Sequence, residues 1–205
     1  MNLQIESYRK FMHFLAIIIP IIFLLLGKNI TILILAPITI FMVSLDYLRR
    51  KDVRIKMFFE KIFGAILRPH ELAGDKLCGA SFLFLGATIN FFFFKPEIAV
   101  TGFLILIISD ALASLVGKAV PSQPFFEKSF SGSAAFFASA LVILIVCGIA
   151  FDTKLWFYLF GFFGIFCVTI IEARPSLIGI DDNLTIPLVF AIEMSFFDIV
   201  WNSVY

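Results

Sequence analysis

Residues 130–151 carry the sequence FSGSAAFFASALVILIVCGIAF, which contains no charged residue. A helix needs about 20 mostly apolar residues to cross about 30 Å of membrane hydrocarbon. The apolar residues of this stretch follow one another without the alternation of a strand in a membrane barrel. The stretch therefore predicts a membrane-spanning helix.

Similar apolar runs recur along the whole chain and are separated by polar breaks or loops. The expected spans are 11–27, 30–48, 77–94, 97–117, 130–151, 155–172 and 184–202. We therefore expect an all-α, polytopic integral membrane protein in which residues 1–205 form one membrane domain of about seven transmembrane helices. The first run lacks a cleavage site and is expected to be retained.

The overall composition excludes an ordinary soluble domain. The 205 residues are 61% hydrophobic and 15% charged, whereas soluble domains are about 45–50% apolar and about 25% charged. None of the three cysteines belongs to a Cys-x-x-Cys pair, so the sequence indicates neither a zinc site nor a disulfide framework.

The distribution of positive charge predicts the orientation. With seven spans, thirteen of the 16 Lys and Arg residues lie on the side of the N-terminus and of the loops 49–76, 118–129 and 173–183. Cytoplasmic loops of membrane proteins are enriched in Lys and Arg. We therefore expect these segments to be cytoplasmic, in a bacterial inner membrane or an endoplasmic-reticulum-type membrane.

The segment 52–68 has a different pattern. Large apolar residues recur at helical spacing, and Arg54, Lys56, Glu60 and Lys61 lie between them. This pattern is typical of an amphipathic helix that lies on a membrane surface. Such a helix could gather anionic lipid, or it could be a structural strut.

Two groups of residues near the N-terminus and in the fourth span could take part in chemistry. Arg9, Lys10 and His13 fall within an arc of about 100° on one helix face, so they could clamp a phosphate. Alternatively, Arg9 and Lys10 could belong only to the general excess of Lys and Arg on the cytoplasmic side, and His13 could have no role. Asp110 lies inside an expected span, where an ionisable residue is a functional hypothesis by default.

Small residues continue the helix face of Asp110. Ala113, Ser114 and Gly117 share that face within about 100°, so a ligand or another backbone could approach closely there. The alternative is a helix-packing strip, because small residues four apart favour close helix packing in membranes.

Two further motifs precede the fifth and seventh spans. Lys128 and Ser129, followed by Gly132, suit an anion site at a helix N-terminus, or only a capped helix start. Asp182 and Asn183 follow Asp181 and offer hard oxygen ligands for Mg²⁺ that carries substrate phosphates. Asp182 or Asn183 could equally cap the seventh span. Phosphoryl transfer requires a clamp for phosphates, a divalent ion and a nucleophile positioned in line. These two motifs, together with the two groups above, could supply all three.

The order and identity of these motifs resemble the CTP-dependent lipid-alcohol kinases, namely dolichol kinase, phytol kinase and yeast-type diacylglycerol kinase, and are distantly similar to phosphatidate cytidylyltransferase. The matching motifs are Arg9-Lys10-x-x-His13, His70-Glu71, Leu77-Cys78-Gly79-Ala80, Asp110-x-x-Ala113-x-x-x-Gly117, Lys128-Ser129-x-x-Gly132-Ser133 and Asp182-Asn183-Leu184-Thr185-Ile186-Pro187. The chain departs from the family pattern at Pro121, where a glycine is usual, and at Ser131, where a glutamate is usual.

The resemblance implies a kinase that transfers the γ-phosphoryl group of CTP to the hydroxyl of a lipid alcohol, with Mg²⁺ as cofactor. The implied partners are CTP and a polyprenol-like, phytol-like or diacylglycerol acceptor, and no nucleic acid. The implied roles are catalysis by Asp110, His13 and Lys128, substrate binding by Arg9, Lys10, Ala113, Gly117, Ser129 and Gly132, and metal binding by Asp110, Asp182 and Asn183.

Two other functions remain open from the sequence. The first is cytidylyl transfer from CTP to phosphatidate, which would use the same clamp and metal but attack a different phosphorus atom. The second is a transporter or structural membrane protein, in which Asp110 and Glu193 would be pathway or pairing groups.

Overall fold

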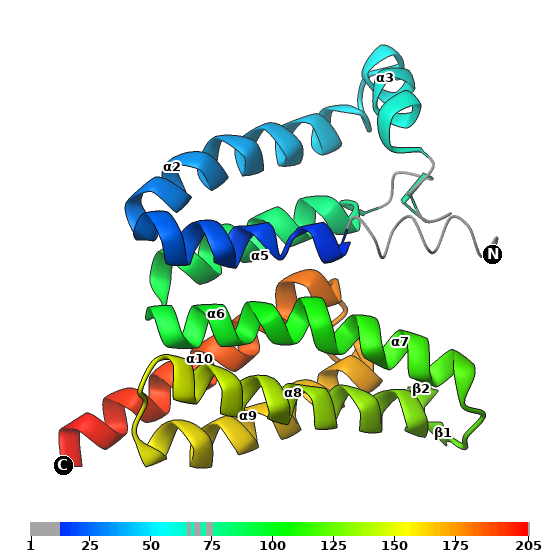
Figure 1. Cartoon of the computed structure of the whole chain (residues 1–205). Helices are drawn as coiled ribbons and strands as arrows, with labels where there is room; N and C mark the ends of the chain where they lie inside the picture. The colour runs from blue at the N-terminus through cyan, green and yellow to red at the C-terminus, as the bar shows by residue number, and fades with distance from the viewer. Residues whose placement is uncertain (1–12, 65–66, 68–70, 73–75, 205) are drawn as a thin grey trace. The chain divides into compact units, whose positions relative to one another are not determined.

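The computed structural model describes residues 13–64, 67, 71–72 and 76–204 and is nearly all-α (Figure 1). The chain divides into two compact units, residues 1–88 and 89–205. The helical elements are α2 (Ile18–Leu48), α3 (Val53–Phe63), α5 (Gly79–Phe93), α6 (Pro96–Leu104), η1 (Ile105–Ser109), α7 (Asp110–Ala119), α8 (Phe130–Ala150), α9 (Leu155–Ala173), η2 (Pro175–Leu177) and α10 (Asp182–Val204).

Five helical runs among the described residues are long and apolar enough to cross a membrane. They are His13–Leu48, Pro96–Ala119, Phe130–Ala150, Leu155–Ala173 and Asp182–Ser203. Helix α5 is apolar but has only 15 residues. The expectation of a helical, multi-pass membrane protein is thus confirmed, and four of the five runs agree closely with single expected spans.

The remaining run, His13–Leu48, contains two of the expected spans and is interrupted at Gly27. Gly27 has φ 79° and ψ 173°, a backbone conformation that side chains with a Cβ rarely adopt. The chain reverses direction there, and Figure 1 shows the two parts of α2 side by side. Ile19 and Ile22 from the first part line a small pocket together with Thr31 and Leu35 from the second. The expected break at 27–29 is therefore a helical turn-back.

A buried polar cluster joins the end of α2 to the start of α5. Asp46 is fully buried and accepts hydrogen bonds from Arg49 Nε at 2.5 Å, from the Cys78 N–H at 2.7 Å and from the Ser81 hydroxyl at 2.7 Å. The Arg49 guanidinium also lies 4.5 Å from the ring centroid of Phe59 in α3. Because buried charges are stable only when paired and hydrogen-bonded, this cluster fixes how the three helices meet.

Helix α3 corresponds to the expected interfacial helix but is shorter than 52–68. The side chain of Asp52 caps its N-terminus by accepting from the N–H groups of Arg54 and Ile55. The helix ends at Phe63, and Gly64 is its C-cap. Glycine is a poor helix former because it loses the most backbone entropy on folding, which fits an end at this position.

The C-terminal unit is a bundle in which α9 packs against α8 and α10, and α7 packs against α8. Helices α6 and α7 form one continuous run through a π-helical turn, η1, that ends immediately before Asp110. At the other end of the bundle, Lys95 forms a 2.6 Å ion pair with Asp198. Short π-helical turns of this kind occur frequently at functional sites.

The expected loop 118–129 contains a short β-hairpin. Strand β1 (Pro124–Phe125) pairs antiparallel with β2 (Lys128–Ser129). The two-residue turn places Phe126 at φ 53°. Positive φ values are the norm in tight hairpin turns because they match the twist of the strands. The residue with positive φ is usually Asn or Gly. Because Phe126 occupies this position, the sequence contained no signal of the turn.

Candidate functional site

The β-hairpin positions Lys128 against the end of α9. The N–H of Glu127 donates to the carbonyl oxygen of Ala173 at 3.0 Å, and the Ser176 hydroxyl donates to the carboxylate of Glu127. These two bonds fix the turn next to the C-terminus of α9. Lys128, the next residue, is thereby directed toward the last turn of that helix.

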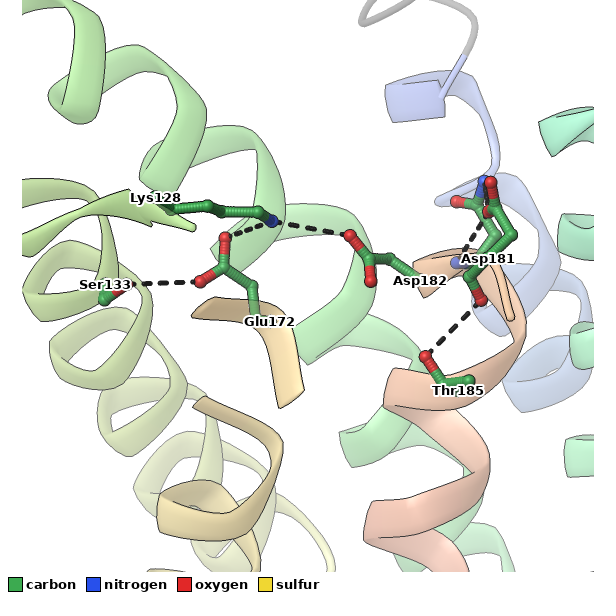
Figure 2. Close-up of polar contacts among 7 residues, drawn as sticks. Lys128, Ser133, Glu172, Asp181, Asp182 and Thr185 are labelled. Atoms are coloured by element: carbon green, nitrogen blue, oxygen red, sulfur yellow. Dashed lines mark hydrogen bonds and ion pairs between the residues drawn. The ribbon is translucent and has the colours of Figure 1, made fainter. Parts of the chain in front are cut away.

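The ammonium group of Lys128 lies between two carboxylates (Figure 2). Its Nζ is 2.6 Å from Oε1 of Glu172 and 3.4 Å from Oδ2 of Asp182. The Glu172 side chain is only 2% exposed, whereas that of Lys128 is 31% exposed. The other oxygen of Glu172 accepts from the Ser133 hydroxyl at 3.4 Å. The hairpin, α8, α9 and α10 therefore each contribute one side chain to a single cluster.

Asp110 adds a third carboxylate to the surroundings of Lys128. Burial by itself lowers the pKa of Lys128. The nearby carboxylates, first that of Asp182 and then those of Glu172 and Asp110, outweigh burial and raise the pKa above its ordinary value. Lys128 is consequently a cation at physiological pH, in a site whose other charged groups are acidic.

The small residues that follow Asp110 lie against the start of α8. A Cβ at Gly117 would be 2.6 Å from the Ser129 hydroxyl oxygen and 3.3 Å from the Cα of Gly132. A Cβ at Gly132 would be 2.8 Å from the carbonyl oxygen of Ala113. This geometry agrees with the helix-packing alternative for these residues. Substrate binding by Ala113, Gly117 and Gly132 stays a prediction.

The backbone donors at the start of α8 already have partners within the chain. The Ser129 hydroxyl accepts from the Gly132 N–H at 3.2 Å, the Ser122 hydroxyl accepts from the Ser131 N–H at 2.9 Å, and the Phe130 N–H donates to Gln123. Ser129 is therefore the N-cap of α8, as the capping alternative anticipated. Binding of an anion by these N–H groups would require exchange of these bonds.

The N-cap of α10 is Asp181, and neither Asp182 nor Asn183, the two residues of the capping alternative, caps the helix. Oδ1 of Asp181 accepts from the Asn183 N–H at 3.0 Å and from the Asn183 side-chain amide at 2.7 Å. The helix begins one residue later than Asp181, so the Asp182 side chain is free to turn toward Lys128. Oδ1 of Asp182 is buried and has no hydrogen-bond partner.

The remaining candidate residues lie outside the described residues or in the N-terminal unit. Arg9 and Lys10, as well as His70 of the family motif, lie outside the described residues. His13 is the first described residue and belongs to the N-terminal unit. Their expected roles in phosphate binding and catalysis stay predictions.

Sequence analysis gave no role to Glu172 or Ser133, although both belong to the cluster. Glu172 lies at the end of an apolar span, and the argument that singled out Asp110, namely that an acid inside a span is costly, applies to it equally. Ser133 had no such signal, because a serine near a helix start is common.

Comparisons with known proteins give one full-length relative. No protein-family model and no solved structure matches the chain significantly. The chain is 34% identical over 199 residues to the uncharacterized protein RP860 of Rickettsia prowazekii (strain Madrid E), and the match covers 96% of each protein. The chain therefore belongs to the same protein family as the Rickettsia prowazekii protein RP860.

Proposed function

We propose that the protein is a membrane lipid kinase that transfers the γ-phosphoryl group of CTP to the hydroxyl of a lipid alcohol. The observation that carries the proposal is the position of Lys128 between Glu172 and Asp182, with Asp110 close by. A cation held between two carboxylates, with a third nearby, suits phosphoryl transfer, which depends on positioning and on charge stabilisation. The resemblance of the motifs that contain Asp110, Lys128 and Asp182 to those of the lipid-alcohol kinases supports this reaction.

In the proposed reaction, Lys128 contacts the phosphates and Asp110 receives the proton of the acceptor. The lipid hydroxyl oxygen attacks the γ-phosphorus, and the bond from that phosphorus to the β–γ bridging oxygen breaks. CDP leaves, and the hydroxyl proton passes to the Asp110 carboxylate. Glu172 holds Lys128 in place through its 2.6 Å contact.

Asp182 fits a role in binding Mg²⁺. Proteins usually hold Mg²⁺ through one or two carboxylates, and water and phosphate oxygens complete the coordination. Asp182 has one buried oxygen without a partner, and within the described ranges no three His, Cys, Asp or Glu side chains gather to hold a metal on their own. The ion, bound by Asp182 and arriving with the nucleotide, would neutralise charge on the phosphates.

The proposal includes seven membrane crossings, with the cluster on the cytoplasmic side. The turn-back at Gly27 supports two crossings within His13–Leu48, and α5 would be a further, shorter crossing. The excess of Lys and Arg on one side supports the orientation. A cytosolic nucleotide and a lipid hydroxyl at headgroup level would then meet at the cluster.

The decisive experiment uses CTP labelled at either the γ- or the α-phosphorus, with purified protein and a panel of lipid alcohols and phosphatidate. Label from the γ position on a lipid alcohol is the expected result. Transfer of α label to phosphatidate would instead indicate cytidylyl transfer. Absence of lipid labelling from either position, with all acceptors and with ATP as well, would contradict the enzymatic proposal and favour a transporter or structural protein.

An Asp110→Asn variant connects the reaction to the cluster. We expect it to insert into the membrane normally and to lose the transfer activity, because an amide cannot accept the hydroxyl proton. Asp198→Asn, at the opposite end of the bundle, is the matched control. Full activity of the Asp110 variant would remove Asp110 from the site.

A further inference from the structure

Helix α3 presents an unusual exposed surface. Its exposed residues are Val53, Arg54, Met57, Phe58, Lys61 and Ile62. Four of these are large and apolar and two are cations, whereas none is acidic. The exposed fractions of Met57 and Phe58 are 66% and 53%. We call these six residues the α3 outer face.

The opposite side of α3 is already used for packing inside the N-terminal unit. Phe59 is fully buried and clusters with Leu67 and Cys78. The Arg49 guanidinium lies 4.5 Å from the Phe59 ring centroid, and an arginine over an aromatic face is attracted to it. The helix is thus fixed in its rotation, and the α3 outer face cannot turn inward to hide its apolar residues.

Helix α3 contains one acid, Glu60, which lies at the edge of the outer face. Glu60 is half-buried and forms a 3.9 Å pair with Lys56. Asp52, immediately before the helix, uses its side chain as the N-cap. The six residues of the outer face therefore include two cations and no acid, and the acid at the edge of the face is paired with Lys56, so the face is complementary to an anionic partner.

The chain connection keeps α3 close to the membrane surface. Helix α2 ends at Leu48 and α3 begins at Val53. Five residue steps reach at most about 18 Å at about 3.6 Å per residue, and α2 is part of a candidate membrane span. With 11 residues, α3 is too short to cross a bilayer, which needs about 20. Figure 1 shows its axis turned away from that of α2.

We propose that the α3 outer face is a binding site for anionic phospholipid. Val53, Met57, Phe58 and Ile62 enter the boundary between headgroups and acyl chains, and Arg54 and Lys61 contact the phosphates of anionic lipids. Apolar residues interleaved with cations are the pattern of helices that lie in a membrane interface. The proposal does not depend on the kinase reaction.

The test measures which lipid touches α3. The full-length variant Phe58→Trp is placed in bilayers that mix phosphatidylcholine and phosphatidylglycerol, with bromine atoms, which quench tryptophan fluorescence, on the chains of one lipid or of the other. The signal of the parent protein, which has two Trp residues, is subtracted. We expect stronger quenching when the phosphatidylglycerol carries the bromine, at equal mole fractions.

Two double variants in the Phe58→Trp background test the role of charge. Arg54→Gln with Lys61→Gln should remove the preference for phosphatidylglycerol. Each cation lost should lower the affinity for anionic lipid roughly fivefold. Arg54→Lys with Lys61→Arg keeps the charge and should keep the preference. Equal quenching by the two brominated lipids in the parent charge state would refute selectivity for anionic lipid. No quenching by either lipid would show that the face meets water or a protein instead, and would equally overturn the proposal.

Discussion

Lys128 and Glu172 are 44 positions apart in the chain, yet the Lys128 ammonium nitrogen lies 2.6 Å from Oε1 of Glu172. The contact exists because the β-hairpin that carries Lys128 is hydrogen-bonded to Ala173, the residue after Glu172. The pair is therefore a property of how the hairpin packs on α9. It joins two segments that the sequence presents as unrelated.

Replacement of Glu172 by Gln should impair the proposed transfer more than it impairs folding. The amide can still accept a hydrogen bond from Lys128 but no longer offers a charge, so the ammonium group is expected to move toward Asp182. A displacement of about 1 Å at a reacting centre costs about 100-fold in rate. The measurement is the rate of γ-phosphoryl transfer together with the KM for CTP.

The matched control for this change is Glu97→Gln, in the first turn of α6, which should leave transfer unchanged. Glu172→Asp, which restores the charge on a shorter side chain, should recover part of the rate. If Glu172→Gln retained the parental rate and KM, Glu172 would have no role in positioning Lys128.

Replacement of Gly117 by Ala should destabilise the contact between α7 and α8. The new methyl group would lie 2.6 Å from the Ser129 hydroxyl oxygen and 3.3 Å from the Cα of Gly132, so the N-cap or the backbone must shift. Overpacking of this kind typically costs about 1–3 kcal/mol. Thermal unfolding in detergent should show a lower midpoint than that of the parent protein. Ser114→Ala, a neighbouring change that removes atoms, is the control, and equal midpoints for all three proteins would contradict the packing role.

Replacement of Arg49 by Met should destabilise the N-terminal unit strongly. Arg49 and Asp46 are both buried, and removal of one partner of a buried ion pair costs about 3–5 kcal/mol because the other charge is left uncompensated. Denaturant unfolding in mixed micelles measures this loss. The double variant Asp46→Asn with Arg49→Met should be more stable than Arg49→Met alone. An Arg49→Met protein as stable as the parent would show that the pair contributes nothing to stability.

The contribution of Lys128 to stability should persist through neutral and moderately alkaline pH. Because the folded pKa of Lys128 is raised above 10.5, its ordinary value, the charged pairs stabilise the folded state fully below 10.5. Their contribution is lost as the pH rises through the folded pKa. We expect the difference in unfolding midpoint between the parent and Lys128→Gln to be constant from neutral to moderately alkaline pH and to shrink only above 10.5. A difference that shrank between neutral pH and 10.5 would contradict the raised pKa of Lys128.

The helices were predictable from the sequence because the length of an apolar run is a local property. The run 130–151 corresponds to α8 at Phe130–Ala150, and 155–172 to α9 at Leu155–Ala173. The break before the second span was also visible, since Gly27 is followed by Lys28 and Asn29. The sequence could not single out Asp181 as the residue that caps α10, because Asp181, Asp182 and Asn183 all favour N-caps and only the backbone geometry separates them.

The sequence by itself determined that this protein is helical and multi-pass, because in hydrocarbon every backbone polar group must be satisfied within its own helix and long apolar runs reveal where this occurs. It also indicated Asp110, Lys128 and Asp182 as chemically costly or useful residues. Only the tertiary structure decided that Lys128 lies between Glu172 and Asp182, and that Gly117 and Gly132 bring α7 and α8 together. The physical reason is that such contacts depend on how the hairpin and separate helices pack against one another, and that packing is not encoded in any single stretch of the chain.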